Sequence, residues 1–262
     1  NTVVGFTALC SNTTGAKNTA IGMQAQFSTT TGSDNISMGR NALYTNSTGS
    51  NNTALGAMSL FRNTTANENV AVGRCSLYNN TEGTKNIAVG SYALDTNTTG
   101  DKNVAIGYQA LDANTTADNN TAVGDSALKT NTTGAENVAV GKNALTANTT
   151  GANNVALGSQ SLDTNTSGSN NTGIGRNALF SNPTASHNTA IGYDSLFSNT
   201  TGSCNIAIGC GAMDSTTTSN SSIAIGFQAL QATNTNGSNL AIGRRALCLT
   251  TSGKCNIAIG DG

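Results

Sequence analysis

Asparagine in the tripeptide Asn-x-Ser/Thr is the most frequent residue in this 262-residue sequence that could carry chemistry. In an extracellular protein this tripeptide accepts an N-linked glycan, so it predicts a glycoprotein. Nine candidate acceptors share one place in a repeating pattern: Asn12, Asn46, Asn63, Asn97, Asn114, Asn131, Asn148, Asn165 and Asn199. Others include Asn51, Asn119 and Asn170. The alternative interpretation is a structural turn rich in Asn and Thr, because glycans every ~4.8 Å along one edge would crowd one another.

Aromatic residues form the second candidate group. Phe27, Tyr44, Phe61 and Tyr78 recur at a constant spacing of 17 residues. Such a row could be an exposed strip that binds a sugar, a receptor or a neighbouring fibre. It could equally be a ladder of side chains that stabilises one face of the fold.

The remaining reactive side chains form no catalytic or metal-binding pattern. The single histidine, His187, has no base or nucleophile spaced around it, and the six cysteines show no zinc spacing. Cys248 and Cys255 flank one turn and are the pair that could form a disulfide. We therefore expect no catalytic residues, no metal, no cofactor and no enzymatic activity.

Adjacent threonines recur beside the candidate glycan acceptors, for example Thr98-Thr99 and Thr115-Thr116. Ordered threonine rows on a flat solenoid can bind ice. Two adjacent residues in a turn point in different directions, however, which argues against one flat face here. Ice or carbohydrate binding is therefore kept as the alternative function.

All of these residues follow a 17-residue repeat that has no insertion or deletion. Its consensus is N-[TVI]-A-[IVL]-G-x-x-A-L-x-x-N-T-T-G-x-x, beginning at Asn1. We number positions 1–17 within this repeat and call the equivalent residues of successive repeats a column. The sequence 1–262 reads as a single array of 15 full coils and a partial coil at 256–262. A fixed period of this length predicts a solenoid.

The columns indicate how each coil folds. Position 5 is Gly in all 16 copies, including Gly5 and Gly107, which indicates a backbone conformation or close approach that only Gly permits. Position 4 is always aliphatic, as at Ile106, and position 9 is Leu in 13 of 15 copies, as at Leu111. We expect a strand over positions 1–5, a second strand near 7–10, and a buried Leu/Ile layer. Asn at position 1 should form a hydrogen-bonded ladder.

Two further columns bear on partners. Position 3 holds only Ala, Ser, Gly or Val, and position 8 holds only Ala or Ser. A solvent-facing column would accept Lys or Glu in some copies. We infer that the strand is buried on both faces, one inside its own coil and one against another chain, which predicts a homo-oligomer. If each coil is self-contained, the Ala/Ser columns line a narrow coil interior instead.

Composition excludes several other partners. Charged residues make up 10% of the chain, against roughly 25% in ordinary domains. The net charge of −1 offers no basic surface for nucleic acid. No apolar run approaches the roughly 18 residues of a membrane span.

The motif N-[TV]-A-[IV]-G-x-x-A, as in Asn188-Thr189-Ala190-Ile191-Gly192, resembles the head repeats of trimeric autotransporter adhesins (YadA-like heads). The longer consensus is similar to fibre repeats of phages and giant viruses. The resemblance implies a left-handed parallel β-roll, three chains to a rod, at the cell surface or on a virion. We therefore expect an all-β parallel solenoid that forms a rigid extracellular fibre and serves adhesion to a cell-surface or glycan receptor. We expect it to associate with itself, with end-to-end growth as one mode of assembly.

Overall fold

The computed structural model describes residues 1–232 and 237–262 and contains 16 short parallel strands. The chain divides into two compact units, Asn1–Thr133 and Gly134–Gly262. The strands of the first unit are β1 (Thr2–Val4), β2 (Thr19–Ile21), β3 (Ile36–Met38), β4 (Thr53–Leu55), β5 (Val70–Val72), β6 (Ile87–Val89), β7 (Val104–Ile106) and β8 (Thr121–Val123). Those of the second are β9 (Val138–Val140), β10 (Val155–Leu157), β11 (Thr172–Ile174), β12 (Thr189–Ile191), β13 (Ile206–Ile208), β14 (Ile223–Ile225), β15 (Leu240–Ile242) and β16 (Ile257–Ile259).

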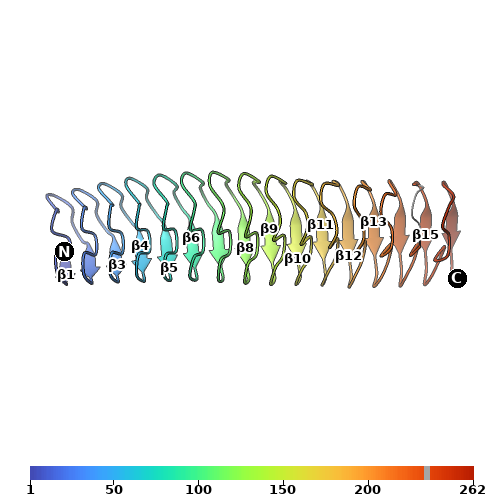
Figure 1. Cartoon of the computed structure of the whole chain (residues 1–262), viewed down its shortest axis with the longest axis horizontal. Helices are drawn as coiled ribbons and strands as arrows, with labels where there is room; N and C mark the ends of the chain where they lie inside the picture. The colour runs from blue at the N-terminus through green and yellow to red at the C-terminus, as the bar shows by residue number, and fades with distance from the viewer. Residues whose placement is uncertain (233–236) are drawn as a thin grey trace. The chain divides into compact units, whose positions relative to one another are not determined.

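Within each unit, every strand pairs in parallel with the equivalent strand one repeat away (Figure 1). The register places Thr2 opposite Thr19 and Val104 opposite Thr121, so each residue contacts its own column mate. The predicted parallel β-solenoid with 17-residue coils is therefore confirmed. Among the described residues, no helix is long and apolar enough to cross a membrane.

The predicted second strand near positions 7–10 is wrong. This part of each described coil is a turn, and its residues at positions 7 and 9 have left-handed backbones, as at Gln109 and Leu111 (both φ 52°). The segment still bonds to the neighbouring coils: Leu111 N donates to the Ala127 carbonyl at 3.0 Å. A left-handed residue costs about 1–2 kcal/mol outside glycine, so this turn persists because burial and these bonds offset that cost.

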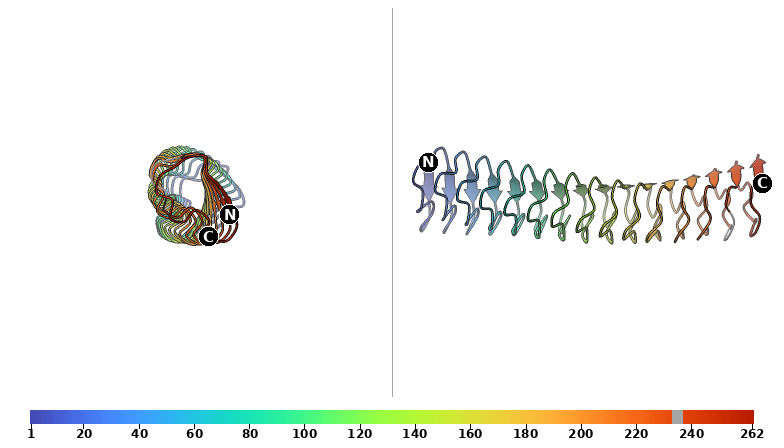
Figure 2. Two further views of the ribbon diagram at one scale, coloured as in Figure 1. Left: turned by 90° about the vertical axis from the view of Figure 1, so that its right-hand side faces the viewer. Right: turned by 90° about the horizontal axis from the view of Figure 1, so that it is seen from above.

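The interior of a coil is narrow, and five columns supply its fully buried side chains, beside the buried Gly or Ala of column 15. In the coil that starts at Asn103, the fully buried side chains are Asn103, Ala105, Ala110, Leu111 and Asn114. Figure 2 shows that, within each unit, successive coils repeat the same backbone path. The predicted interior position of Leu111 is confirmed.

Asparagine ladders tie the coils together from inside. The Asn35 backbone N–H donates to Asn18 Oδ1 at 3.0 Å, and Asn35 Nδ2 donates to the Gly49 carbonyl at 2.9 Å. The same bonds recur at Asn52, which donates to Asn35 Oδ1. Each amide thereby satisfies backbone groups that would otherwise be buried without partners. The predicted ladder at position 1 is confirmed.

The structure also decides which strand face is inside. Column 3 points into its own coil and is fully buried at Ala105, whereas Ile106 in column 4 is 40% exposed. The inference that the Ala columns contact another chain is wrong, as is the assignment of Ile106 to the buried layer. At Gly173 a Cβ would lie 2.5 Å from Ser161 Oγ, so the glycine there leaves room for a serine in place of the usual alanine of column 8. The alternative of a narrow coil interior lined by Ala and Ser is the observed one.

Candidate functional site

Column 12 contains the nine predicted glycan acceptors, and the structure places eight of them inside the coil. Asn97 Nδ2 donates to Asn80 Oδ1 at 2.8 Å and to the Gly100 carbonyl at 3.0 Å. A glycan on Nδ2 would remove a donor from this ladder and would have no path to solvent. The prediction is therefore corrected for the following residues, all fully buried: Asn46, Asn63, Asn97, Asn114, Asn131, Asn148, Asn165 and Asn199. Asn12, in the first coil, is half-buried.

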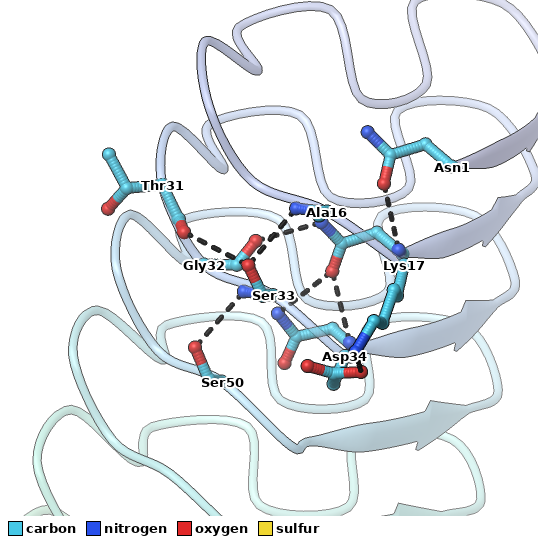
Figure 3. A network of polar contacts seen from close by, with 10 residues as sticks. Asn1, Ala16, Lys17, Thr31, Gly32, Ser33, Asp34 and Ser50 are labelled. Atoms are coloured by element: carbon cyan, nitrogen blue, oxygen red, sulfur yellow. Dashed lines mark hydrogen bonds and ion pairs between the residues drawn. The ribbon is translucent and has the colours of Figure 1, made fainter.

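Column 17 lies at a solvent-facing corner immediately before each strand. Figure 3 shows this corner at the first coils, where Lys17 and Asp34 form an exposed ion pair at 3.9 Å. Asp34 N donates to the Ala16 carbonyl at 3.0 Å, which holds the backbone of this column in place. The side chain points to solvent, so the residue type can differ from coil to coil. The tripeptide alone does not distinguish the Asn-x-Thr acceptors of this column from those of column 12. The frequent Lys, Asp and Glu residues of column 17 are the signal that marks it as exposed.

The predicted aromatic strip is a closed stack of rings. The centroids of Phe27 and Tyr44 are 5.1 Å apart with an interplanar angle of 7°, and Phe61 and Tyr78 are 5.0 Å apart at 3°. All four side chains are half-buried. Inner rings use both faces for stacking and present only their edges to solvent, so they offer no open face to a sugar. The structure supports the stabilising ladder and argues against the binding strip.

Acidic residues replace the aromatic ladder in the next coils of column 10. Burial, and to a smaller extent the neighbouring Asp112 carboxylate, together raise the pKa of Asp95 to about 6. Burial also raises the pKa of Asp112, while Lys129 opposes that shift. Asp95 Oδ1 is buried and has no hydrogen-bond partner among the described residues. At this point of column 10, burial and the neighbouring carboxylate both disfavour the ionised form of Asp95.

We predict that Asp95→Asn stabilises the first unit at neutral pH. Because the folded-state pKa of Asp95 lies above its unfolded value, the native state binds more protons, and wild-type stability should rise as pH falls from about 6 toward 4. At pH 7.5 the variant should melt roughly 2–4 °C higher, a modest effect since the carboxyl is half-exposed. The measurement is thermal melting followed by circular dichroism at pH 7.5 and pH 4.

The control is Asp125→Asn, which removes an exposed carboxylate one coil beyond Asp112. Its melting temperature should stay within error of the wild type at both pH values. An Asp95→Asn advantage of equal size at pH 7.5 and pH 4 would contradict the electrostatic explanation.

The outward strand face, formed by columns 2 and 4, lies outside the coil interior, and we call it the β-face. None of its 32 side chains is charged, and all are Val, Ile, Leu, Met or Thr. Ile36, Met38, Ile87 and Ile106 are each about two-fifths exposed. The aliphatic pattern of these columns predicts an interior position, and that prediction is wrong. The signal that could have identified them is the restriction of column 3 to small residues, which marks the tighter face.

Other candidate groups are satisfied or isolated. All six cysteines are free, so the possible Cys248–Cys255 disulfide is not formed. Threonine hydroxyls of column 13 donate to the next coil, as Thr98 Oγ1 does to the Thr115 carbonyl at 3.0 Å. Residues 1–232 and 237–262 form no pocket. Within these ranges, no group of three or more His, Cys, Asp or Glu side chains could hold a metal ion. His187 is exposed at column 17.

The described residues thus present an apolar strand face, a stack of aromatic rings and exposed corner asparagines. Comparison with models of protein families, with curated proteins and with solved structures finds no match to the chain.

Proposed function

We propose that this chain is a structural element of an extracellular fibre, a stiff β-solenoid that associates with copies of itself through the β-face. The proposal assigns it no catalytic activity. Adhesion to a cell or glycan receptor would then be a property of the assembled fibre.

The internal ladders support a mechanical role. Each coil bonds to the next through its strand, its turns and two asparagine columns, as at Asn103 N to Asn86 Oδ1, 2.9 Å. In such an array stability is approximately a sum over coils and nearest-neighbour interfaces, so it grows with repeat number. Identical coils also give stiffness along the stack without a large globular core.

The β-face is the single observation that carries self-association. Three-residue strands spaced by ~4.8 Å give each eight-stranded unit a flat face of roughly 400 Å². The largest apolar patch on a typical monomer is roughly 300–600 Å², and a standard interface buries about 800 Å² per partner. The face of one unit lies within the patch range and supplies about half of the area that one partner buries in a standard interface. An uncharged face of this extent favours burial.

The repeat of the β-face favours a second copy of the chain as the occupant. Its rows of side chains recur once per coil, and a partner keeps matched contacts over many coils only if it has the same axial repeat. A second copy of this chain has the same axial repeat because it has the same sequence. Three copies around a common axis, the arrangement implied by the adhesin-like motif, would bury all of their β-faces together.

We predict that Ile106→Lys weakens self-association at least tenfold in dissociation constant. A lysine in the middle of the β-face would be buried without a partner charge in the assembly. Sedimentation velocity across nanomolar to micromolar concentrations measures the effect, and electron microscopy of the same samples gives the number of chains per cross-section.

Thr116→Lys is the matched control, because it adds the same charge to the same coil at an exposed turn position. It should leave the dissociation constant unchanged. The proposal fails if the wild-type chain is a folded monomer at micromolar concentration, or if both lysine variants assemble as the wild type does.

A further inference from the structure

We infer that Asn51, Asn119 and Asn170, all in column 17, are N-glycosylation sites, and that the solenoid carries sparse glycans at this corner rather than a row of them along column 12. The inference deepens the proposed function by naming a modification of the extracellular fibre, and it rests on that function only for the cellular location.

Three structural properties separate these asparagines from the buried column. Their side chains are exposed, and their side-chain amides donate no hydrogen bond to any residue that the structure describes. Their backbone N–H groups are bonded, as Asn51 N is to the Ser33 carbonyl at 3.1 Å. Their backbones are left-handed with φ of 59°, a conformation that Asn tolerates better than most residues. Their column also accepts Lys, Asp, Glu and His elsewhere, so a substituent there displaces nothing.

The second half of each tripeptide is equally accessible. The hydroxyl residues Thr53, Thr121 and Thr172 are the column 2 members of β4, β8 and β11, and they point outward with partial exposure. Spacing also permits occupancy, because Asn51 and Asn119 lie four coils apart in the first unit, roughly 19 Å at strand spacing. Crowding, which disfavours glycans on a continuous column, does not arise here.

The modification is a transfer from a lipid-linked oligosaccharide diphosphate. The asparagine Nδ2 attacks the anomeric carbon of the first sugar, so the N–C1 bond forms and the C1–O bond to the diphosphate breaks. The lipid diphosphate leaves, and Nδ2 gives up one proton to a base of the transferase. At Asn97 the same Nδ2 is buried and donates two hydrogen bonds, so folded chains carrying a glycan there are excluded.

The test is secretion of the full chain from a eukaryotic cell that performs N-glycosylation, followed by intact mass and peptide mapping of the folded, protease-resistant fraction. We expect glycans at Asn51, Asn119 and Asn170, removed by peptide N-glycosidase, and bare peptides for the eight buried column 12 residues. Thr53→Val should abolish the glycan at Asn51 alone. Valine occupies the same column at Val70 and Val104, so the fold should be unaffected.

A matched exchange moves one acceptor by a single coil. Asn153 is exposed with φ of 59° but is followed by Asn154 and Val155, so it lacks the hydroxyl residue. The double variant Val155→Thr/Thr172→Val keeps the composition and should transfer the glycan from Asn170 to Asn153. Glycans on buried column 12 residues of the folded fraction, or bare Asn51, Asn119 and Asn170, would overturn the inference. Running the self-association test on protein made in bacteria, which carries no such glycans, makes its result independent of this one.

Discussion

Leu111→Asp should unfold the coils around it, at a cost of roughly 4 kcal/mol or more. Leu111 is fully buried, and its neighbours in the column, Leu94 and Leu128, are buried as well. An aspartate there would place an unpaired carboxylate in an apolar layer with no route to water. Thermal and urea unfolding should show a lower midpoint, and hydrogen exchange should show lost protection centred on this coil.

Two substitutions in the same column test the cause. Leu111→Met should cost less than about 1.5 kcal/mol, since Met213 fills this column fully buried in another coil. Leu111→Gln should be clearly destabilising, and adding Ala122→Ser should recover part of the loss. In the native coil with Gln26, Gln26 Nε2 donates to Ser37 Oγ at 3.0 Å, and Ala122 occupies the place equivalent to Ser37. Unchanged melting of Leu111→Asp would refute the interior assignment.

The pair Gln26 and Ser37 also shows what a repeat sequence can reveal about its own interior. Each residue departs from its column consensus of Leu and Ala, and the two departures meet in space as a hydrogen bond. The coil length, the strand at positions 2–4 and the buried leucines were all predictable, because 16 copies show which column tolerates which residue. Coupled departures of this kind identify contacts between columns as well.

The sidedness of the strand was not predictable in the same way. Alternation shows that Ala105 and Ile106 face opposite directions, but it does not show which of the two is inside. Aliphatic columns normally mark a core, and here they mark the outer face, since asparagine and leucine already fill a narrow interior. The prediction of glycans in column 12 was wrong for a related reason. An Asn/Thr-rich turn produces the tripeptide at Asn97 by composition alone, whereas burial of the side-chain amide decides whether a glycan can be attached.

The left-handed turn residues were hidden for a different physical reason. Leucine is a poor residue for positive φ, so Leu111 gave no local signal of the backbone it adopts. Its conformation is imposed by the coil, which must turn inward at position 9 to bury the side chain. Only the glycine column signalled its conformation directly, because there the constraint is on the backbone itself.

Gly107→Val should be as damaging as a charge in the core, at about 2–6 kcal/mol, since backbone strain and overpacking each cost about 1–3 kcal/mol. Gly107 has φ of 140°, and all 16 glycines of column 5 lie between 126° and 144°, a region closed to residues with a Cβ. A Cβ at Gly107 would also collide with the carbonyl oxygen of Gly124 in the next coil. Thermal unfolding should show this loss as a lower melting temperature of the variant.

The matched comparison is Gly107→Ala against Gly100→Ala, the same substitution seven residues apart. Column 15, which contains Gly100, accepts alanine at Ala66, Ala117 and Ala185, and the Gly100 backbone lies outside the left-handed region. We therefore expect Gly107→Ala to lower the midpoint of urea unfolding several times more than Gly100→Ala. Equal losses would mean that close packing between coils alone explains the glycines. A larger loss at Gly107 would assign the difference to backbone conformation, because both positions face a carbonyl of the next coil and only one requires positive φ.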